Sequence, residues 1–257
     1  KERWEAPRLE YAILDADDSN FVDEYTLTYA QQSAMDPTGD ELEAFVAEMS
    51  AVLQANNGLD VYKKDSFHGK LVLFDFRSHL YAPLICLEKS NLKIQLSPVA
   101  LNTDEMRFVD YLKAYVDNHA AELVDKSLYL LRNKSKVGMG FFEAGNFYPD
   151  YILWIDTPET QYISFIDPKG LMHIRPDDPK IEFYKTIKDL ETRLSPTADG
   201  KRIVLNSFIM AGTRSSDLRM WWSTPEVDAD RAYREARNVY TLDNDECVES
   251  MMRKILQ

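Results

Sequence analysis

Two apolar, aromatic-rich runs separated by a short polar segment constrain the fold more than any other feature of this chain. They cover residues 146–155 and 161–170, and the segment between them reads DTPET. Short runs of this composition on either side of a turn-forming segment are typical of two antiparallel strands. The pattern therefore predicts a hairpin in which residue 156 pairs with residue 161.

The predicted hairpin would bring two acidic residues and a lysine to one place. In that register Asp150 lies directly opposite Asp167, with the two Cα atoms about 4.5–5.5 Å apart. Lys169 is two residues beyond Asp167, so its side chain falls on the same face of the strand. Pro168 has no N–H group for a sheet ladder, which indicates that the strand ends or reaches a sheet edge there.

An acid pair with an adjacent lysine has the chemistry of a metal and phosphate site. Two carboxylates this close raise each other's pKa unless a positive charge lies between them. Mg²⁺ prefers carboxylate oxygens and keeps several waters, one of which can become a nucleophile. Lys169 could then orient that water or stabilise the charge of a pentacovalent phosphorane. The alternative interpretation is a hairpin with a polar tip whose acids have no chemical role.

Pro149-Asp150 followed by Asp167-Pro168-Lys169 resembles the PD-(D/E)xK nuclease motif. The surrounding sequence is similar to the C-terminal nuclease region of DEAD/DEAH-box helicases of the type III restriction-enzyme (Res subunit) kind, over roughly residues 100–210. Aspartate at position 167 replaces the glutamate that is commoner in this superfamily.

The resemblance implies a fold, an activity and a set of partners. The expected fold class is α/β, with a restriction-endonuclease-like core in which helices flank a mixed β-sheet. The expected activity is that of a Mg²⁺- or Mn²⁺-dependent DNA endonuclease, with Asp150 and Asp167 as metal ligands and Lys169 as a further catalytic residue. The implied partners are DNA, a helicase motor in the same parent chain and a modification (methyltransferase) subunit. A different alternative is an inactive nuclease-like module that binds DNA or docks the motor.

Glu105 has two interpretations. Asn102 can cap a helix, and Glu105 three residues later completes a capping box. By resemblance, Glu105 is also the acidic residue that many nucleases of this superfamily carry on the helix before the core sheet, which would make it a catalytic residue and third metal ligand. Glu122 and Glu143 are weaker candidates for that role.

The charge distribution bears on a DNA partner. The net charge is −13, and residues 1–60 carry 14 acidic and 3 basic side chains, whereas residues 61–216 carry 20 and 21. Basic residues on both sides of the hairpin could contact phosphates, although such runs are also common on solvated surfaces. The candidate DNA-contacting residues are Arg132, Lys134, Lys136, Lys180 and Lys188.

The chain divides into two predicted parts. Residues 1–98 form an acidic, strand-rich flanking module, and residues 99–257 form the nuclease domain. We expect strands at 9–14, 25–29, 71–76, 81–88, 92–96, 127–131, 137–142 and 202–210, and helices at 40–55, from 102, after Asp178, at 228–239 and from 244. We expect the adjacent Trp221 and Trp222 to pack on opposite faces of a strand, with stacking on unpaired bases as the alternative.

Three further features concern the cellular context. The sequence has no G-x-x-x-x-G-K-[ST] phosphate loop and begins at Lys1, so we expect a portion of a longer protein without its motor. No apolar run approaches 18 residues, which predicts no membrane insertion. Cys86 and Cys247 show no paired spacing, as expected in a reducing cytoplasm.

Overall fold

The structure is a computed structural model, and it describes residues 26–29, 38–54, 61–66, 69–74, 84–88, 94–97, 101–133, 140–141, 144–145 and 147–257. The expected strand at 9–14, most of that at 137–142, and the residues Lys134, Lys136 and Glu143 lie outside these ranges. The elements are β1 (Thr26–Tyr29), α1 (Gly39–Gln54), β2 (Val61–Ser66), β3 (Gly69–Phe74), β4 (Leu84–Glu88), β5 (Ile94–Ser97), α2 (Thr103–Asn118), β6 (Ser127–Arg132), β7 (Tyr151–Asp156), β8 (Thr160–Lys169), α3 (Pro179–Glu191), β9 (Arg202–Ala211), α4 (Ser215–Trp222), α5 (Arg231–Glu235), β10 (Val239–Thr241) and α6 (Glu246–Ile255).

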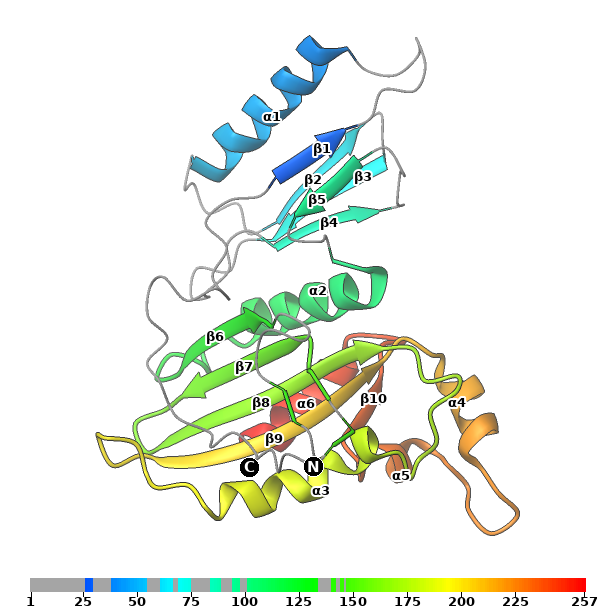
Figure 1. Cartoon of the computed structure of the whole chain (residues 1–257). Coiled ribbons are helices and arrows are strands. Elements are labelled where there is room, and N and C mark those ends of the chain that lie inside the picture. Colours follow the sequence, from blue (N-terminus) through cyan, green and yellow to red (C-terminus); the bar gives the residue numbers. More distant parts are fainter. Residues whose placement is uncertain are drawn as a thin grey trace, which may run out of the picture.

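A five-stranded mixed sheet forms the centre of the C-terminal part (Figure 1). Its strand order is β10-β9-β8-β7-β6. The pairs β6–β7 and β7–β8 are antiparallel, and the pairs β8–β9 and β9–β10 are parallel. In the β7–β8 hairpin Asp156 pairs with Gln161, so the predicted register is confirmed. The chain is therefore α/β, as predicted.

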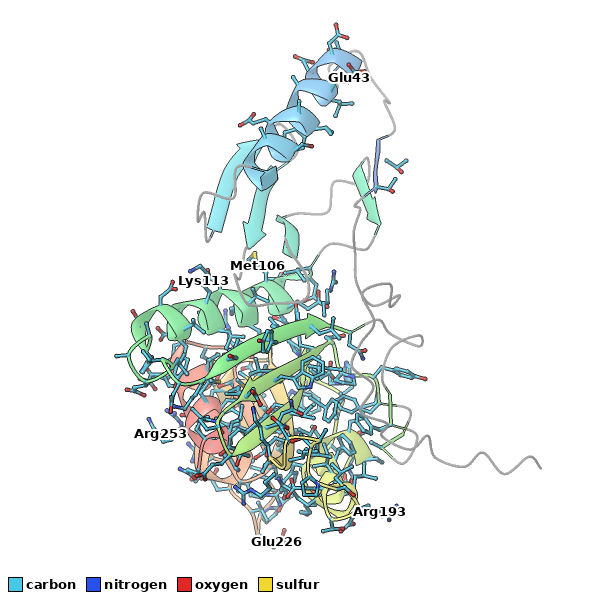
Figure 2. The ribbon with its side chains drawn as sticks, turned by 90° about the vertical axis from the view of Figure 1, so that its left-hand side faces the viewer. Glu43, Met106, Lys113, Arg193, Glu226 and Arg253 are labelled. Atoms are coloured by element: carbon cyan, nitrogen blue, oxygen red, sulfur yellow. The ribbon has the colours of Figure 1, made fainter. Side chains whose placement is uncertain are left out.

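Helices cover both faces of this sheet. Consecutive residues 163–168 of β8 and 205–211 of β9 are buried, which requires cover on each side because neighbouring side chains point to opposite faces. In the side view, α2 and α6 lie on one side of the sheet and contact each other, while α3 lies on the other (Figure 2). The helix predicted after Asp178 is confirmed as α3, and its Phe183 and Ile187 are buried against the sheet.

The N-terminal elements lie beyond α2, away from the five-stranded sheet (Figure 1). β1 pairs with β5, and β2, β3 and β4 form a separate antiparallel sheet. This part is strand-rich, as predicted, but β2 was not among the expected strands because Lys63, Lys64 and Asp65 interrupt its apolar pattern. The large buried core of the described residues begins at Leu101.

Three expectations for the C-terminal segment can be checked. Trp221 and Trp222 lie in helix α4, so the expected strand is wrong there. The expected helix at 228–239 is shorter, because the chain leaves α5 at Glu235 and enters β10 at Val239. The last helix is confirmed, and it buries Val248, Met251, Met252 and Ile255. Within the described ranges no helix has both the length and the apolar character to cross a membrane.

Candidate functional site

One edge of the five-stranded sheet gathers the residues that the hairpin motif singles out. Strands β8, β9 and β10 are parallel, so they all end at this edge, whereas the antiparallel β7 begins there at Tyr151. Asp150 comes directly before β7, and Asp167 and Lys169 are in the last three residues of β8. The carboxyl edge of parallel strands is where ligands bind in open α/β sheets.

Asp167, which is buried, and Asp150, which is half-buried, form an acid pair. The ladder between β7 and β8 ends at Tyr151 and Ile166, and its continuation by one residue places Asp150 opposite Asp167. The two carboxyl groups are close enough for a hydrogen bond between them when one is protonated. Burial, the charge of Asp167 with this hydrogen bond, and the charge of Glu105 together raise the pKa of Asp150 to about 8, although Lys169 acts in the opposite direction. The pair therefore holds a proton more tightly than an ordinary aspartate does.

Lys169 lies beside the acid pair. Its ammonium forms an ion pair with Asp167, which is only 5% exposed, and lies 5.3 Å from the ring centroid of Phe147. Its carbonyl oxygen accepts a hydrogen bond from the Gly212 N–H at 3.0 Å, so the backbone groups of Lys169 face β9. The backbone groups of the preceding Pro168 therefore face the opposite side, beyond the end of β7. No strand there needs a hydrogen bond from residue 168, so a proline, which has no N–H group, is tolerated.

Glu105 serves the capping role and also lies near the acid pair. Asn102 Oδ1 accepts hydrogen bonds from the backbone N–H groups of Asp104 and Glu105, both at 2.9 Å, and Glu105 Oε2 accepts from the Asn102 N–H at 2.7 Å. The predicted capping box is therefore confirmed. The same Oε2 accepts from the Arg132 guanidinium at 3.2 Å, and the carboxylate is close enough to raise the pKa of Asp150.

Two supporting residues escaped the sequence analysis. Asn133 donates from its backbone N–H to the Asp150 carbonyl and from its side-chain amide to the Pro149 carbonyl, both at 2.8 Å, and so fixes the backbone that carries Asp150. At Gly212 any Cβ would lie 2.0 Å from Asp104 Oδ2, so glycine lets the end of β9 approach the start of α2. The glycine directly after a buried strand was a usable signal, but nothing in the basic turn marked Asn133.

The acid pair fits a hard divalent cation better than a structural ion pair. Its donors are carboxylate oxygens, and the pKa of Asp150 is raised first by burial and then by the neighbouring charges of Asp167 and Glu105, which a cation would neutralise. Within the described residues no group of three or more His, Cys, Asp or Glu side chains could hold a metal ion. Mg²⁺ needs no such group, because it is commonly bound by one or two carboxylates together with waters and substrate phosphate. Asp150 and Asp167 are thus the residues that could hold it, whereas the Glu105 carboxylate is engaged by Arg132.

The predicted DNA-contacting residues do not form one continuous surface in the described ranges. Arg132 points at Glu105 and is largely covered. The Lys188 ammonium donates to the Leu205 carbonyl at 2.6 Å and pairs with Glu191 at 2.8 Å, so it is tied to its own fold. Lys180 is half-buried in the first turn of α3.

Comparisons of the chain with models of known families, with curated proteins and with solved structures found no match. Function must therefore be inferred from the residues themselves. Their arrangement combines an acid pair and a lysine at the edge of the sheet where the parallel strands end.

Proposed function

We propose that this chain is a metal-dependent DNA endonuclease domain of the PD-(D/E)xK type. The observation that carries the proposal is the pair of half-buried Asp150 and buried Asp167, with Lys169 ion-paired to Asp167 at the end of β8. The element order supports it, since α2, the antiparallel β6, β7 and β8, the crossover helix α3 and the parallel β9 follow one another as the resemblance implies. These elements would form the restriction-endonuclease-like core.

The proposed reaction is in-line hydrolysis of a phosphodiester bond. Asp150 and Asp167 would hold Mg²⁺ or Mn²⁺, which when bound supplies a polarised phosphoryl oxygen and an acidic water. Asp150 has to release its proton before it can act as a ligand, so metal binding at neutral pH would be coupled to proton release. Lys169 is held between Asp167 and Phe147, where its ammonium would orient the attacking water or stabilise the charge of the phosphorane.

The proposed context is a restriction or phage-defence helicase–nuclease that works in the cytoplasm. In that setting the domain would act next to a helicase motor of the same parent chain, and a methyltransferase subunit would be a further partner. The net charge of −13 supports a motor that holds the DNA, because an acidic chain repels the DNA phosphates.

One observation favours the alternative of an inactive module that binds DNA or docks the motor. Glu105, the expected third acid, accepts hydrogen bonds from Asn102 and Arg132 through the same oxygen. If a third carboxylate is needed for activity, this arrangement withholds it. The acid pair and Lys169 are nevertheless complete, which favours the enzyme.

Incubation of the purified chain with supercoiled plasmid and Mg²⁺ or Mn²⁺ tests the proposal directly. We expect nicked or linear DNA that disappears when EDTA is added and when Asp150 is replaced by asparagine. Intact plasmid with every metal would show the enzyme assignment to be wrong, and DNA binding in the same samples would then support the inactive module.

A further inference from the structure

A pocket of about 670 Å³ is lined by residues other than the acid pair and Lys169, and it has no part in the proposed hydrolysis. Its walls come from the loop after β8, which includes Met172 and His173, from Trp221 and Trp222 of α4, which follows β9, and from Tyr233 and Arg237. Both β8 and β9 end at the edge that carries the acid pair, so the loops that build the pocket start at this edge. Its volume is within the range of about 300–1,000 Å³ that is usual for ligand sites.

The pocket presents an exposed aromatic ring on a rigid support. Trp221 is 54% exposed, and His173 approaches it edge-on with ring centroids 6.5 Å apart. The neighbouring Trp222 is buried, and its indole N–H donates to the Ile174 carbonyl at 2.8 Å, which ties α4 to the loop after β8. The indole of Trp221 is therefore held at the surface by a fixed helix rather than by a loose chain.

The lining of the pocket includes the cation Arg237 as well as the rings of Trp221 and Tyr233. The Arg237 guanidinium stacks on the Tyr233 ring, with Cζ 3.6 Å from the ring centroid. The two acids that line the pocket, Asp177 and Glu182, are each paired with a base, Asp177 with Arg175 at 3.1 Å and Glu182 with Lys185. An aromatic platform with a guanidinium nearby favours a flat, electron-rich ring attached to an anionic backbone.

We propose that this pocket binds an unpaired nucleobase of the substrate strand, which stacks on Trp221 while the neighbouring phosphate lies toward the acid pair. This inference rests on the proposed function in taking DNA as the substrate, and it adds that the DNA is single-stranded or locally unpaired at the site. A helicase motor that separates strands would supply such a substrate.

The test compares two labelled oligonucleotides by fluorescence anisotropy with the whole chain, at low salt and in EDTA, so that no cleavage occurs. One is a single-stranded oligodeoxynucleotide, and the other is its abasic counterpart with the same number of phosphates. We expect the wild-type protein to bind the base-containing strand more tightly. Trp221→Ala should weaken that binding about ten-fold, as is usual for the loss of one stacked base, and should leave the abasic strand unaffected. Trp221→Phe should retain most of the preference.

Met220→Ala is the matched control, because Met220 is on the same helix, is 72% exposed and is not among the residues that line the pocket. Equal affinity of the wild type for both strands, or an equal loss for both in Trp221→Ala, would overturn the inference. The inference would also be overturned if Trp221→Ala changed the sedimentation of the DNA-free protein but not its DNA binding. Trp221 would then belong to a contact between copies of the chain. If plasmid is cut but bases make no difference, this inference fails alone; if bases matter but no metal permits cleavage, only the nuclease proposal fails.

Discussion

At the scale of single residues, the proton on Asp150 is the feature with the widest consequences. An aspartate normally loses its proton near pH 3.8, but burial and the neighbouring charges of Asp167 and Glu105 raise this pKa to about 8. Strongly shifted groups that combine burial with a specific charged partner are enriched at functional sites. Two predictions concern this pair, and a third concerns the neighbouring Lys169.

Asp150→Asn and Asp167→Asn should each abolish cleavage without unfolding the protein. Each change removes a proposed metal ligand, and it also removes one of two carboxyl groups that repel each other when both are ionised. Plasmid cleavage and thermal unfolding should be measured together. Asp156→Asn is the matched control, since Asp156 is at the opposite end of the same strand and pairs with Lys201. Cleavage at the parent rate by either site variant would disprove the metal assignment.

The metal-free protein should lose stability as the pH rises from about 4 to about 8. In this interval the folded protein keeps the proton on Asp150 while the unfolded chain has released it, so the unfolding free energy falls with rising pH, by at most about 1.4 kcal/mol per pH unit from this group. The contribution is complete below pH 3.8 and is lost as the pH passes 8. Urea unfolding in EDTA should show a steeper fall for the wild type than for Asp150→Asn. Parallel curves would contradict the raised pKa.

Lys169→Ala should abolish cleavage but leave metal binding intact. An ammonium group cannot be a metal ligand, and its removal makes the acid pair more negative, so affinity for Mn²⁺ should hold or increase. Calorimetric titration with Mn²⁺ measures this affinity apart from activity. Joint loss of metal binding and cleavage would show that Lys169 maintains the shape of the site instead of taking part in the reaction.

At the scale of elements, the start of α2 links helix stability to the site. The capping box of Asn102 and Glu105 satisfies backbone N–H groups that an uncapped helix leaves without partners. The same glutamate pairs with Arg132 at the end of β6, and Asp104 packs against Gly212 at the end of β9. The helix terminus therefore holds the ends of two strands at the edge that carries the acid pair.

Asn102→Ala should destabilise the protein by about 1 kcal/mol, because the acceptor for two N–H groups is lost. Chemical denaturation measures the change. Asn102→Ser is the control, since serine caps helices about as well as asparagine and should restore most of the stability. An equal loss in both variants would mean that the asparagine acts through a contact other than the cap.

At the scale of the whole molecule, negative charge is expected to weaken any binding of DNA. Residues 1–60 hold 14 acidic and 3 basic side chains, so a negative field is concentrated in the N-terminal part. Several bases near the site are committed to internal pairs, as Arg132 is to Glu105 and Lys188 is to Glu191. Few remain to neutralise phosphates in the described part of the chain.

The isolated chain should therefore bind duplex DNA weakly and with a shallow salt dependence. Each phosphate contact contributes about −0.9 to the slope of log K against log salt, and only a few contacts are expected. Anisotropy titrations over a range of salt concentrations measure both quantities. Submicromolar affinity at physiological salt would contradict the prediction and would indicate a phosphate-binding surface that the described residues do not reveal.

Local patterns in the sequence were enough to predict much of the fold. The β7–β8 register followed from the period of two and a short turn, and the capping box followed from the spacing of Asn102 and Glu105. Strand β9 was evident as an unbroken apolar run. The acid pair could be anticipated for the same reason, because Asp150 and Asp167 are brought together by a hairpin and not by a distant part of the chain.

What only the tertiary structure decided depends on contacts between residues far apart in the chain. The short β10 is a strand because it pairs with β9, although its own three residues carry no pattern. Arg132 turns inward because Glu105, 27 residues earlier, is there to receive it. Trp222 is buried because α4 packs it against the loop after β8, where its indole N–H donates to the Ile174 carbonyl, whereas Trp221 stays 54% exposed. The pKa of Asp150 depends on burial by the whole fold, and no local pattern reports burial of that kind.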